Sequence, residues 1–101
     1  MKNHSDAERQ AIEDAEADLC RAFLAMNSVD ECRDLLIDLC TPAELEAMID
    51  RWRVVALLAD DRPYRDISEL TGVSVTTIGR VSRALAYGKG GYRMAFRRSV
   101  N

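Results

Sequence analysis

Three arginines in the second half of the chain have a spacing suited to contact with nucleic acid. Arg65 precedes Arg80 by fifteen positions, and Arg83 follows Arg80 by three. A guanidinium group can donate two parallel hydrogen bonds to a guanine edge or pair with a phosphate. The small residues that accompany these arginines are Val75, Thr76 and Gly79. A helical face of small and cationic side chains can enter a major groove and reach both bases and phosphates.

Two short helical patterns, over about residues 64–87, would position these side chains as a helix-turn-helix. The apolar residues that mark the two buried faces are Ile67 and Leu70 in the first helix, and Ile78, Val81 and Leu85 in the second. Gly72 can adopt the left-handed conformation that ends the first helix. Ser74 can then cap the second helix through its hydroxyl.

Three side chains around the turn bear on this prediction. Ser68 is small where the two helices approach each other, and Val73 is an apolar anchor for the turn. Thr71 fits less well, because an apolar residue is common at the end of the first helix. A helical hairpin without DNA-binding activity can carry the same pattern, so a protein-interaction module remains an alternative. The cationic, small-residue face favours DNA, because a protein-binding face usually carries larger apolar groups.

Charge is unevenly distributed along the 101 residues, whose net charge is -3. Residues 1–50 carry 4 basic and 13 acidic side chains, a net of -9, whereas residues 51–101 carry 10 basic and 4 acidic ones, a net of +6. A basic half that contains the helix-turn-helix is the electrostatic footprint of phosphate binding. Length and composition predict one domain over residues 1–101.

Residues that form metal or catalytic sites are sparse in this chain. Cys20, Cys32 and Cys40 are 12 and 8 positions apart, a spacing that fits no CxxC-type pair, and their helical patterns favour core filling. The single histidine, His4, lies near the N-terminus. We therefore expect no metal site, no cofactor and no enzymatic activity. We also expect a cytoplasmic protein, because the chain lacks both a run of ~20 apolar residues and a signal peptide.

The remaining patterns predict an all-α fold of five to six helices. Capping boxes at Ser5, Ser28 and Thr41 open three helices, and Pro42 and Pro63 suit first helical positions. The apolar stripes are Ile12, Ala15, Leu19, Ala22, Phe23 and Met26; Cys32, Leu35, Leu36 and Leu39; and Leu45, Met48, Ile49, Trp52, Val55 and Leu58. A Gly-rich basic tail is expected over residues 88–101. An interlocked homodimer would cover these stripes, although a compact monomer is an open alternative.

From about Leu39 to Leu85 the chain resembles the Trp repressor family. The landmarks of this resemblance are Thr41-Pro42, Arg51-Trp52-Arg53-Val54-Val55, Arg65-Asp66-Ile67 and Thr77-Ile78-Gly79-Arg80. The continuation Ala86-Tyr87-Gly88-Lys89-Gly90-Gly91-Tyr92 is similar to the YerC/YecD-type members of that family. The resemblance implies an intertwined, all-helical homodimer whose second helices enter successive major grooves of double-stranded DNA roughly 34 Å apart. It implies a sequence-specific transcriptional regulator that acts as a repressor on an operator.

The resemblance also implies roles for single residues. In the family an arginine at the position of Arg65 contacts a base, and the start of the second helix faces the groove. That face is here Ser74, Val75, Thr76 and Gly79. Thr77, Ser82 and Arg83 are implied phosphate contacts, which position the protein without specifying a sequence. Ser68 and Arg80 complete the expected DNA-contact set.

A tryptophan pocket is the second site that the resemblance implies. In the repressor two arginines enclose the indole ring beside a threonine, and the counterparts here are Arg51, Arg80 and Thr41. Val81 replaces a glycine, and Ala84 replaces a serine near the ligand. Overpacking by the valine costs about 1–3 kcal/mol, and loss of the serine removes about 1 kcal/mol. We therefore expect regulation independent of tryptophan, with a tryptophan-responsive repressor as the alternative.

Overall fold

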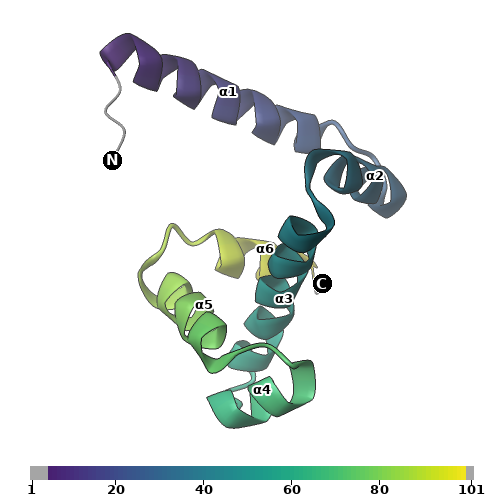
Figure 1. Ribbon diagram of the computed structural model, residues 1–101, viewed down its shortest axis with the longest axis vertical. Coiled ribbons are helices and arrows are strands. Elements are labelled where there is room, and N and C mark those ends of the chain that lie inside the picture. Colours follow the sequence, from purple (N-terminus) through teal and green to yellow (C-terminus); the bar gives the residue numbers. More distant parts are fainter. Residues whose placement is uncertain (1–4, 100–101) are drawn as a thin grey trace. The chain divides into compact units, whose positions relative to one another are not determined.

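The computed structural model describes residues 5–99, which form six α-helices and no strand (Figure 1). The helices are α1 (Asp6–Leu24), α2 (Val29–Leu39), α3 (Pro42–Ala59), α4 (Tyr64–Thr71), α5 (Val75–Tyr87) and α6 (Gly91–Ser99). The predicted all-α class is confirmed. The chain divides into an N-terminal unit with α1 and α2 and a C-terminal unit with α3 to α6. The prediction of one domain over residues 1–101 stays a prediction.

Serine caps begin both helices of the N-terminal unit. The Ser5 hydroxyl accepts a hydrogen bond from the amide of Glu8 at 3.2 Å, and the Ser28 hydroxyl accepts one from Glu31 at 3.1 Å. The Glu31 carboxylate also accepts from the amide of Asn27 at 2.8 Å. These bonds satisfy amide groups that a helix start would otherwise leave without partners.

The apolar stripes of the N-terminal unit lie at its surface. Within the described part of the chain, α1 and α2 contain no buried residue. The large apolar side chains that stay exposed are Ile12, Leu19, Leu24, Val29, Ile37 and Leu39. Leu24 alone is 83% exposed. One chain therefore leaves in water the faces that the sequence predicts to be inward.

The core of the C-terminal unit lies between α3, α4 and α5. Its buried residues are Val54, Val55, Ile67, Val73, Ile78 and Val81. α3 packs against α4, α5 and α6, and α4 packs against α5, as Figure 1 shows for the teal, green and yellow helices. The predicted stripe on α5 is confirmed, because Leu85 also packs against this core.

α3 buries a different face from the predicted one. Val55 is buried as expected, and its neighbour Val54 is buried too. Met48, Ile49 and Trp52 were expected inside but are exposed in their own chain, Trp52 by 40%. The α3 side chains that join the core of one chain all lie at or beyond Val54. Burial of the earlier turns of α3, which the sequence analysis ties to a homodimer, stays a prediction. The other helices of the unit pack against the second half of α3.

The chain leaves α3 through a left-handed turn at Asp61, where φ is 55°. The amide of Asp61 donates to the carbonyl of Leu58 at 3.0 Å, and the amide of Arg62 donates to that of Leu57 at 3.2 Å. This pair of bonds forms a Schellman motif, which usually places glycine at the left-handed position. Pro63 then occupies the N-cap position of α4, and its side chain forms no capping bond. The sequence analysis predicts Pro63 at the first helical position, which is instead Tyr64.

The turn between α4 and α5 depends on one glycine and one threonine. Gly72 has φ of 76°, and its amide donates to the carbonyl of Ser68 at 2.8 Å, which ends α4 as predicted. The Thr71 hydroxyl donates to the carbonyl of Ile67 at 2.7 Å and accepts from the amide of Val73 at 3.1 Å. Thr71 therefore ties the turn together through its hydroxyl, which explains a polar residue at this position.

Leu70 is placed differently from the prediction. It was expected beside Ile67 on the buried face of α4, but it is 61% exposed, whereas Ile67 is buried. Thr71 is half-buried instead. Residues three and four positions after Ile67 lie on opposite sides of it around the helix, and in α4 the side of Thr71 is the more buried one.

Residues 91–99 of the expected Gly-rich basic tail are helical. They form α6, which packs against α3 and α5 and adds Tyr92 and Phe96 to the edge of the core. The chain leaves α5 at Gly88, where an added Cβ would lie 2.4 Å from the carbonyl oxygen of Ala84. Glycine is therefore required at this position for the chain to turn back toward α3. Residues 100 and 101 lie outside the described residues.

Candidate nucleic-acid interface

The face of α5 that points away from the core is small and cationic. Its exposed residues are Val75, Thr76, Arg80 and Arg83, with half-buried Gly79 among them. We call these five residues the outer stripe of α5. The opposite face carries the buried Ile78 and Val81. Helix α5 therefore separates its core-forming side chains from the residues predicted to contact DNA.

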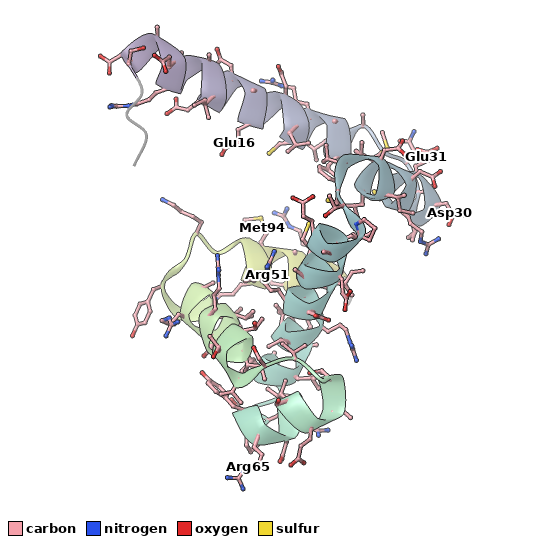
Figure 2. All side chains as sticks on the ribbon, in the orientation of Figure 1. Glu16, Asp30, Glu31, Arg51, Arg65 and Met94 are labelled. Carbon is pink, nitrogen blue, oxygen red and sulfur yellow. The ribbon has the colours of Figure 1, made fainter. Side chains whose placement is uncertain are left out.

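Three arginines of the predicted set are free to bind an external acceptor. Arg65 lies on the surface of α4, and Figure 2 shows its side chain directed away from the C-terminal unit. Within residues 5–99, Arg65, Arg80 and Arg83 form no hydrogen bond or ion pair through their guanidinium groups. Arg21 and Arg33 of the N-terminal unit differ, because aspartates hold them at 2.7 and 3.0 Å.

The start of α5 uses two of the predicted contact residues for its own capping. The Ser74 hydroxyl accepts from the amide of Thr77 at 3.2 Å and donates to the Thr77 hydroxyl at 3.1 Å. Its proton is therefore engaged inside the protein. The Thr77 hydroxyl accepts this bond and keeps its own proton for an external acceptor such as a phosphate oxygen.

Ser68 and Ser82 stand apart from the outer stripe of α5. Both are half-buried. Ser68 lies on α4, where its carbonyl closes the turn to Gly72. Ser82 lines a cavity that α5 shares with α3, α4 and α6. The structure brings Arg80, Arg83 and the small residues onto one stripe of α5. Ser82 lies off this stripe, on the side of α5 that lines the cavity.

Tyr64 is a residue that the sequence reasoning passed over. It opens α4 directly before Arg65, and it is partly exposed. Its ring carbon Cε2 would lie 3.9 Å from a Cβ added at Gly79. Tyr64 therefore supports the outer stripe of α5 from the neighbouring helix. No local pattern in the sequence specifies this contact, because it depends on how α4 and α5 pack against each other.

The charge of the C-terminal segment suits a polyanion. No acidic residue follows Glu69, and the later part of the chain contains six cations. They are Arg80, Arg83, Lys89, Arg93, Arg97 and Arg98. The outer stripe of α5 therefore lies in a segment with no carboxylate of its own to repel a phosphate backbone.

The residues of the predicted tryptophan pocket have different environments. Val81 is 1% exposed and belongs to the core, and Ala84 lines a small cavity beside residues 88–92. Arg51 is half-buried on α3, and Arg80 is exposed on α5. Thr41 belongs to the N-terminal unit. Among these five residues of the predicted tryptophan pocket, Ala84 lines one of the two cavities of the C-terminal unit, and the other four are absent from the described walls of both.

The described residues offer neither a cluster of metal ligands nor a membrane-spanning helix. Within residues 5–99, no group of three or more His, Cys, Asp or Glu side chains is arranged to hold a metal ion. His4 lies outside the described residues. Among the described helices, none combines the length and apolar character that crossing a membrane requires.

Similarities to known proteins extend over most of the chain. A sequence model of the Trp repressor protein matches residues 16–100. The uncharacterized protein YerC of Bacillus subtilis is 36% identical over 80 residues, which cover 79% of this chain and 77% of that protein. A crystal structure of a TrpR-like protein from Eubacterium eligens is 40% identical and matches with a TM-score of 0.79, covering 84% of this chain and 88% of the other.

These similarities confirm the resemblance seen in the sequence. The family match covers most of the chain and includes the whole C-terminal unit except its last residue. The family's fold is of a helix-turn-helix regulator type rather than of an enzyme type. This chain belongs to the Trp repressor family.

Proposed function

We propose that this protein is a sequence-specific regulator of transcription that binds double-stranded DNA through α5 and represses by occupying an operator. The observation that carries the proposal is the outer stripe of α5, where Arg80 and Arg83 have no partner within residues 5–99. A helix surface of this composition fits a major groove, because its small residues permit close approach and its cations meet phosphates. Membership in a family of helix-turn-helix regulators supports the same conclusion.

The contact residues divide into two roles in this proposal. Arg65 reads a guanine through two parallel hydrogen bonds, and Val75 and Thr76 contact thymine methyl groups. Thr77 and Arg83 bind phosphates and set the register of the helix on the duplex. The free guanidinium groups and the free Thr77 proton support these assignments.

A homodimer is part of the proposal. The apolar residues of α1 and α2 are exposed in one chain, and so are Met48, Ile49 and Trp52 on α3. Water-exposed apolar surface of this extent favours association with a complementary surface. A second copy of the chain brings the same stripes, so a two-fold interface covers both sets at once. Two copies of α5 then address two half-sites on one face of the duplex.

Independence from tryptophan is the last part of the proposal. Val81 fills space in the core beside Ile78, with 1% of its surface exposed. A side chain that the core needs cannot be withdrawn to open a slot for an indole ring without leaving a cavity, which itself destabilises the fold. The arginine pair alone offers a ring about 0.5–2 kcal/mol of cation–π attraction.

Selection of binding sites from fragmented genomic DNA tests the proposal. The purified full chain is mixed with fragments of its host genome, and bound fragments are sequenced. We expect enrichment of a two-fold symmetric motif whose half-sites are about one helical turn apart. Gel-shift titrations at several salt concentrations should then give tighter binding to the motif than to scrambled DNA, with both affinities falling as salt rises.

A reporter placed behind the selected operator distinguishes repression from activation. Expression should fall when the protein is supplied and recover when the operator is scrambled. Enrichment of no motif, together with equal affinity for every duplex, would contradict sequence-specific binding. A protein partner captured by the outer stripe of α5 in place of DNA would favour the interaction-module alternative.

A further inference from the structure

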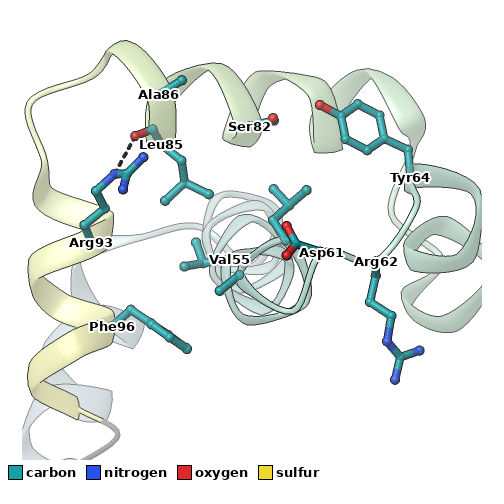
Figure 3. Close-up of a pocket in the computed structure, with 11 residues that line it drawn as sticks. Val55, Asp61, Arg62, Tyr64, Ser82, Leu85, Ala86, Arg93 and Phe96 are labelled. Atoms are coloured by element: carbon teal, nitrogen blue, oxygen red, sulfur yellow. Dashed lines mark hydrogen bonds between the residues drawn. The ribbon is translucent and has the colours of Figure 1, made fainter.

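A half-open cavity of about 620 Å³ lies at the surface of the C-terminal unit, between α3, α4, α5 and α6 (Figure 3). Its walls come from the end of α3, the first residue of α4, the second half of α5 and the middle of α6. Pockets that bind small molecules typically measure ~300–1,000 Å³. Of the residues discussed for the tryptophan pocket, Arg51, Arg80, Val81 and Ala84 are absent from its described walls. The cavity is therefore a separate site.

The floor of the cavity is apolar. Leu58, Leu85 and Phe96 line it, and each is a partly buried side chain packed against the core. Figure 3 shows Phe96 and Leu85 extending toward the cavity from two different helices. A ligand with an apolar body of one ring or a short branched chain would cover these groups from water.

Arg93 gives the cavity an oriented cation. Its Nε donates to the carbonyl of Leu85 at 2.8 Å, the bond drawn in Figure 3. This bond fixes the guanidinium plane and leaves the donors of its two terminal nitrogens unused. Within residues 5–99, Arg93 has no carboxylate partner. A fixed guanidinium group beside an apolar floor is suited to a carboxylate.

Asp61 gives the opposite charge at another wall. It holds the left-handed position of the Schellman motif after α3, and its carboxylate forms no bond within the described residues. Arg62 also lines the cavity, although its Nε pairs with Asp60 at 3.3 Å. Asp60 neutralises Arg62, so the unpaired charges at the cavity walls are the Arg93 guanidinium and the Asp61 carboxylate. The segment after Glu69, which contains Arg93, carries six cations and no carboxylate, and this favours an anion at Arg93.

We propose that this cavity binds a small organic acid, with its carboxylate on Arg93 and its apolar body on Leu58, Leu85 and Phe96. Asp61 limits the ligand to one anionic group, because a second carboxylate near it would be repelled. The hydroxyl groups of Tyr64 and Ser82 on the same walls can bond to polar atoms of the ligand.

The ligand would also bear on the DNA-contact surface, a consequence that rests on the proposed function. Tyr64 lines the cavity and lies against Gly79 of the outer stripe of α5. Ser82 and Leu85 place α5 itself on the cavity wall. A bound acid therefore contacts both helices of the helix-turn-helix and favours one spacing between them. DNA affinity should differ between the free and the bound protein.

Three matched probes test the binding without DNA. Phenylacetate, its neutral amide phenylacetamide and the amine phenethylamine are titrated into the full chain with labelled methyl groups, followed by NMR. We expect saturable shifts at Val55, Leu58 and Leu85 with phenylacetate, in the millimolar range expected for so small a ligand. The signals of Leu24 and Val29 in the N-terminal unit should stay unchanged. The amide and the amine should bind more weakly than the acid.

Substitutions at the two charged walls should act in opposite directions. Arg93→Met should weaken phenylacetate by roughly tenfold or more, because it removes a charged hydrogen-bond donor. Asp61→Asn should strengthen it by about two- to threefold, because it removes a like charge. Arg98→Met removes a cation from the same helix outside the cavity and is the matched control, with no expected change. Ala86→Phe places a ring at the cavity wall and should abolish binding even if Arg93→Met loosens α6.

Several results would overturn the site. They are equal or tighter binding of the amine, shifts confined to Leu24 and Val29, no saturable shift with any probe, or a weakening by Asp61→Asn. The regulatory half is tested separately, by gel shifts on the selected operator with and without saturating phenylacetate. An unchanged DNA affinity would overturn that half alone. Loss of sequence-specific DNA binding would contradict the proposed function and leave the binding result standing.

Discussion

The helices of the N-terminal and C-terminal units begin with the same kind of cap, but only those of the C-terminal unit form a buried core. α2 and α5 both begin at a serine whose hydroxyl accepts from the amide three residues later, at 3.1 Å for Ser28 and 3.2 Å for Ser74. Yet α2 buries no described residue, whereas α5 buries Ile78 and Val81. Capping therefore determines where a helix begins, but a core requires other helices packed against it.

Charge divides the chain along a similar line. The first 50 residues have a net charge of -9 and the remainder +6. In the N-terminal unit, arginines are neutralised by aspartates three positions away, as in Arg21 with Asp18. In the C-terminal unit, Arg65, Arg80 and Arg83 have no such partner among the described residues. The arginines of the N-terminal unit are therefore paired within their own helices, whereas these three arginines of the C-terminal unit are available to an anion, as the proposed binding to DNA requires.

The largest effect should come from the core that only the C-terminal unit has. Ile78→Ala should lower the free energy of unfolding by about 2–5 kcal/mol, because a fully buried side chain leaves a cavity behind. Val75→Ala on the same helix is the control and should change stability by less than about 0.5 kcal/mol, because Val75 is exposed. Urea unfolding followed by circular dichroism measures both. Equal losses would erase the contrast between the buried and exposed faces of α5.

The next effect concerns the exposed stripe of the N-terminal unit. Light scattering of the native protein should give about twice the chain mass of 11.3 kDa. Leu19→Glu should weaken the dimer by about 2–3 kcal/mol or more, because a leucine is lost and a charge is placed in an apolar interface. Glu16→Gln on the same helix should leave the mass unchanged. A native monomer well above micromolar concentration would overturn the interlocked dimer.

The fold could be predicted from the sequence wherever short-range chemistry decides it. Gly72 and Ser74 mark the turn and the cap by their own conformational and bonding preferences. The stripe of α5 follows from its helical spacing. Trp52 could not be placed, because its burial depends on which helices pack on α3. Leu70 was misplaced for a similar reason, since the packing of α4 against α3 and α5 buries the side that carries Thr71 and leaves Leu70 exposed.

A third, intermediate effect separates the two roles proposed for the DNA-contact arginines. Arg65→Ala should cost about 1–3 kcal/mol on the preferred operator and relax the base preference at one position. Arg83→Ala should weaken all duplexes about equally and flatten the dependence of affinity on salt. Gel shifts on the operator and on single-base variants measure both. The opposite pattern would reverse the two assignments.

The candidate site is less predictable than the fold, and the reasons are physical. The outer stripe of α5 follows from its sequence pattern alone, since residues on one helical face are fixed by spacing. Ser82 is set apart only because α3 and α6 form a cavity against it. Tyr64 touches the site through Gly79, a contact between two helices that no local pattern specifies.

A smaller effect compares two left-handed positions in the C-terminal unit. Gly72→Ala should destabilise the fold by about 1 kcal/mol, a purely conformational cost, because no heavy atom lies within 4 Å of the added Cβ. Asp61→Gly should stabilise it by about 0.5–1 kcal/mol, because glycine relieves the strain at φ of 55°. Thermal unfolding at one protein concentration measures both. Destabilisation by Asp61→Gly would show that the aspartate side chain supports the α3–α4 turn.

The smallest effect is the one expected from tryptophan. Free tryptophan should not change DNA affinity, because Val81 occupies the core and is 1% exposed. Attraction between a cation and a ring is worth about 0.5–2 kcal/mol, which is less than or comparable to the cost of about 1–3 kcal/mol for overpacking the site. Titration calorimetry on the purified protein should give no saturable heat, and gel shifts should coincide with and without the amino acid. The same titration on Val81→Gly measures whether the valine alone closes the slot. Tight binding to the native protein would require Val81 to leave the core, and would restore tryptophan as an effector.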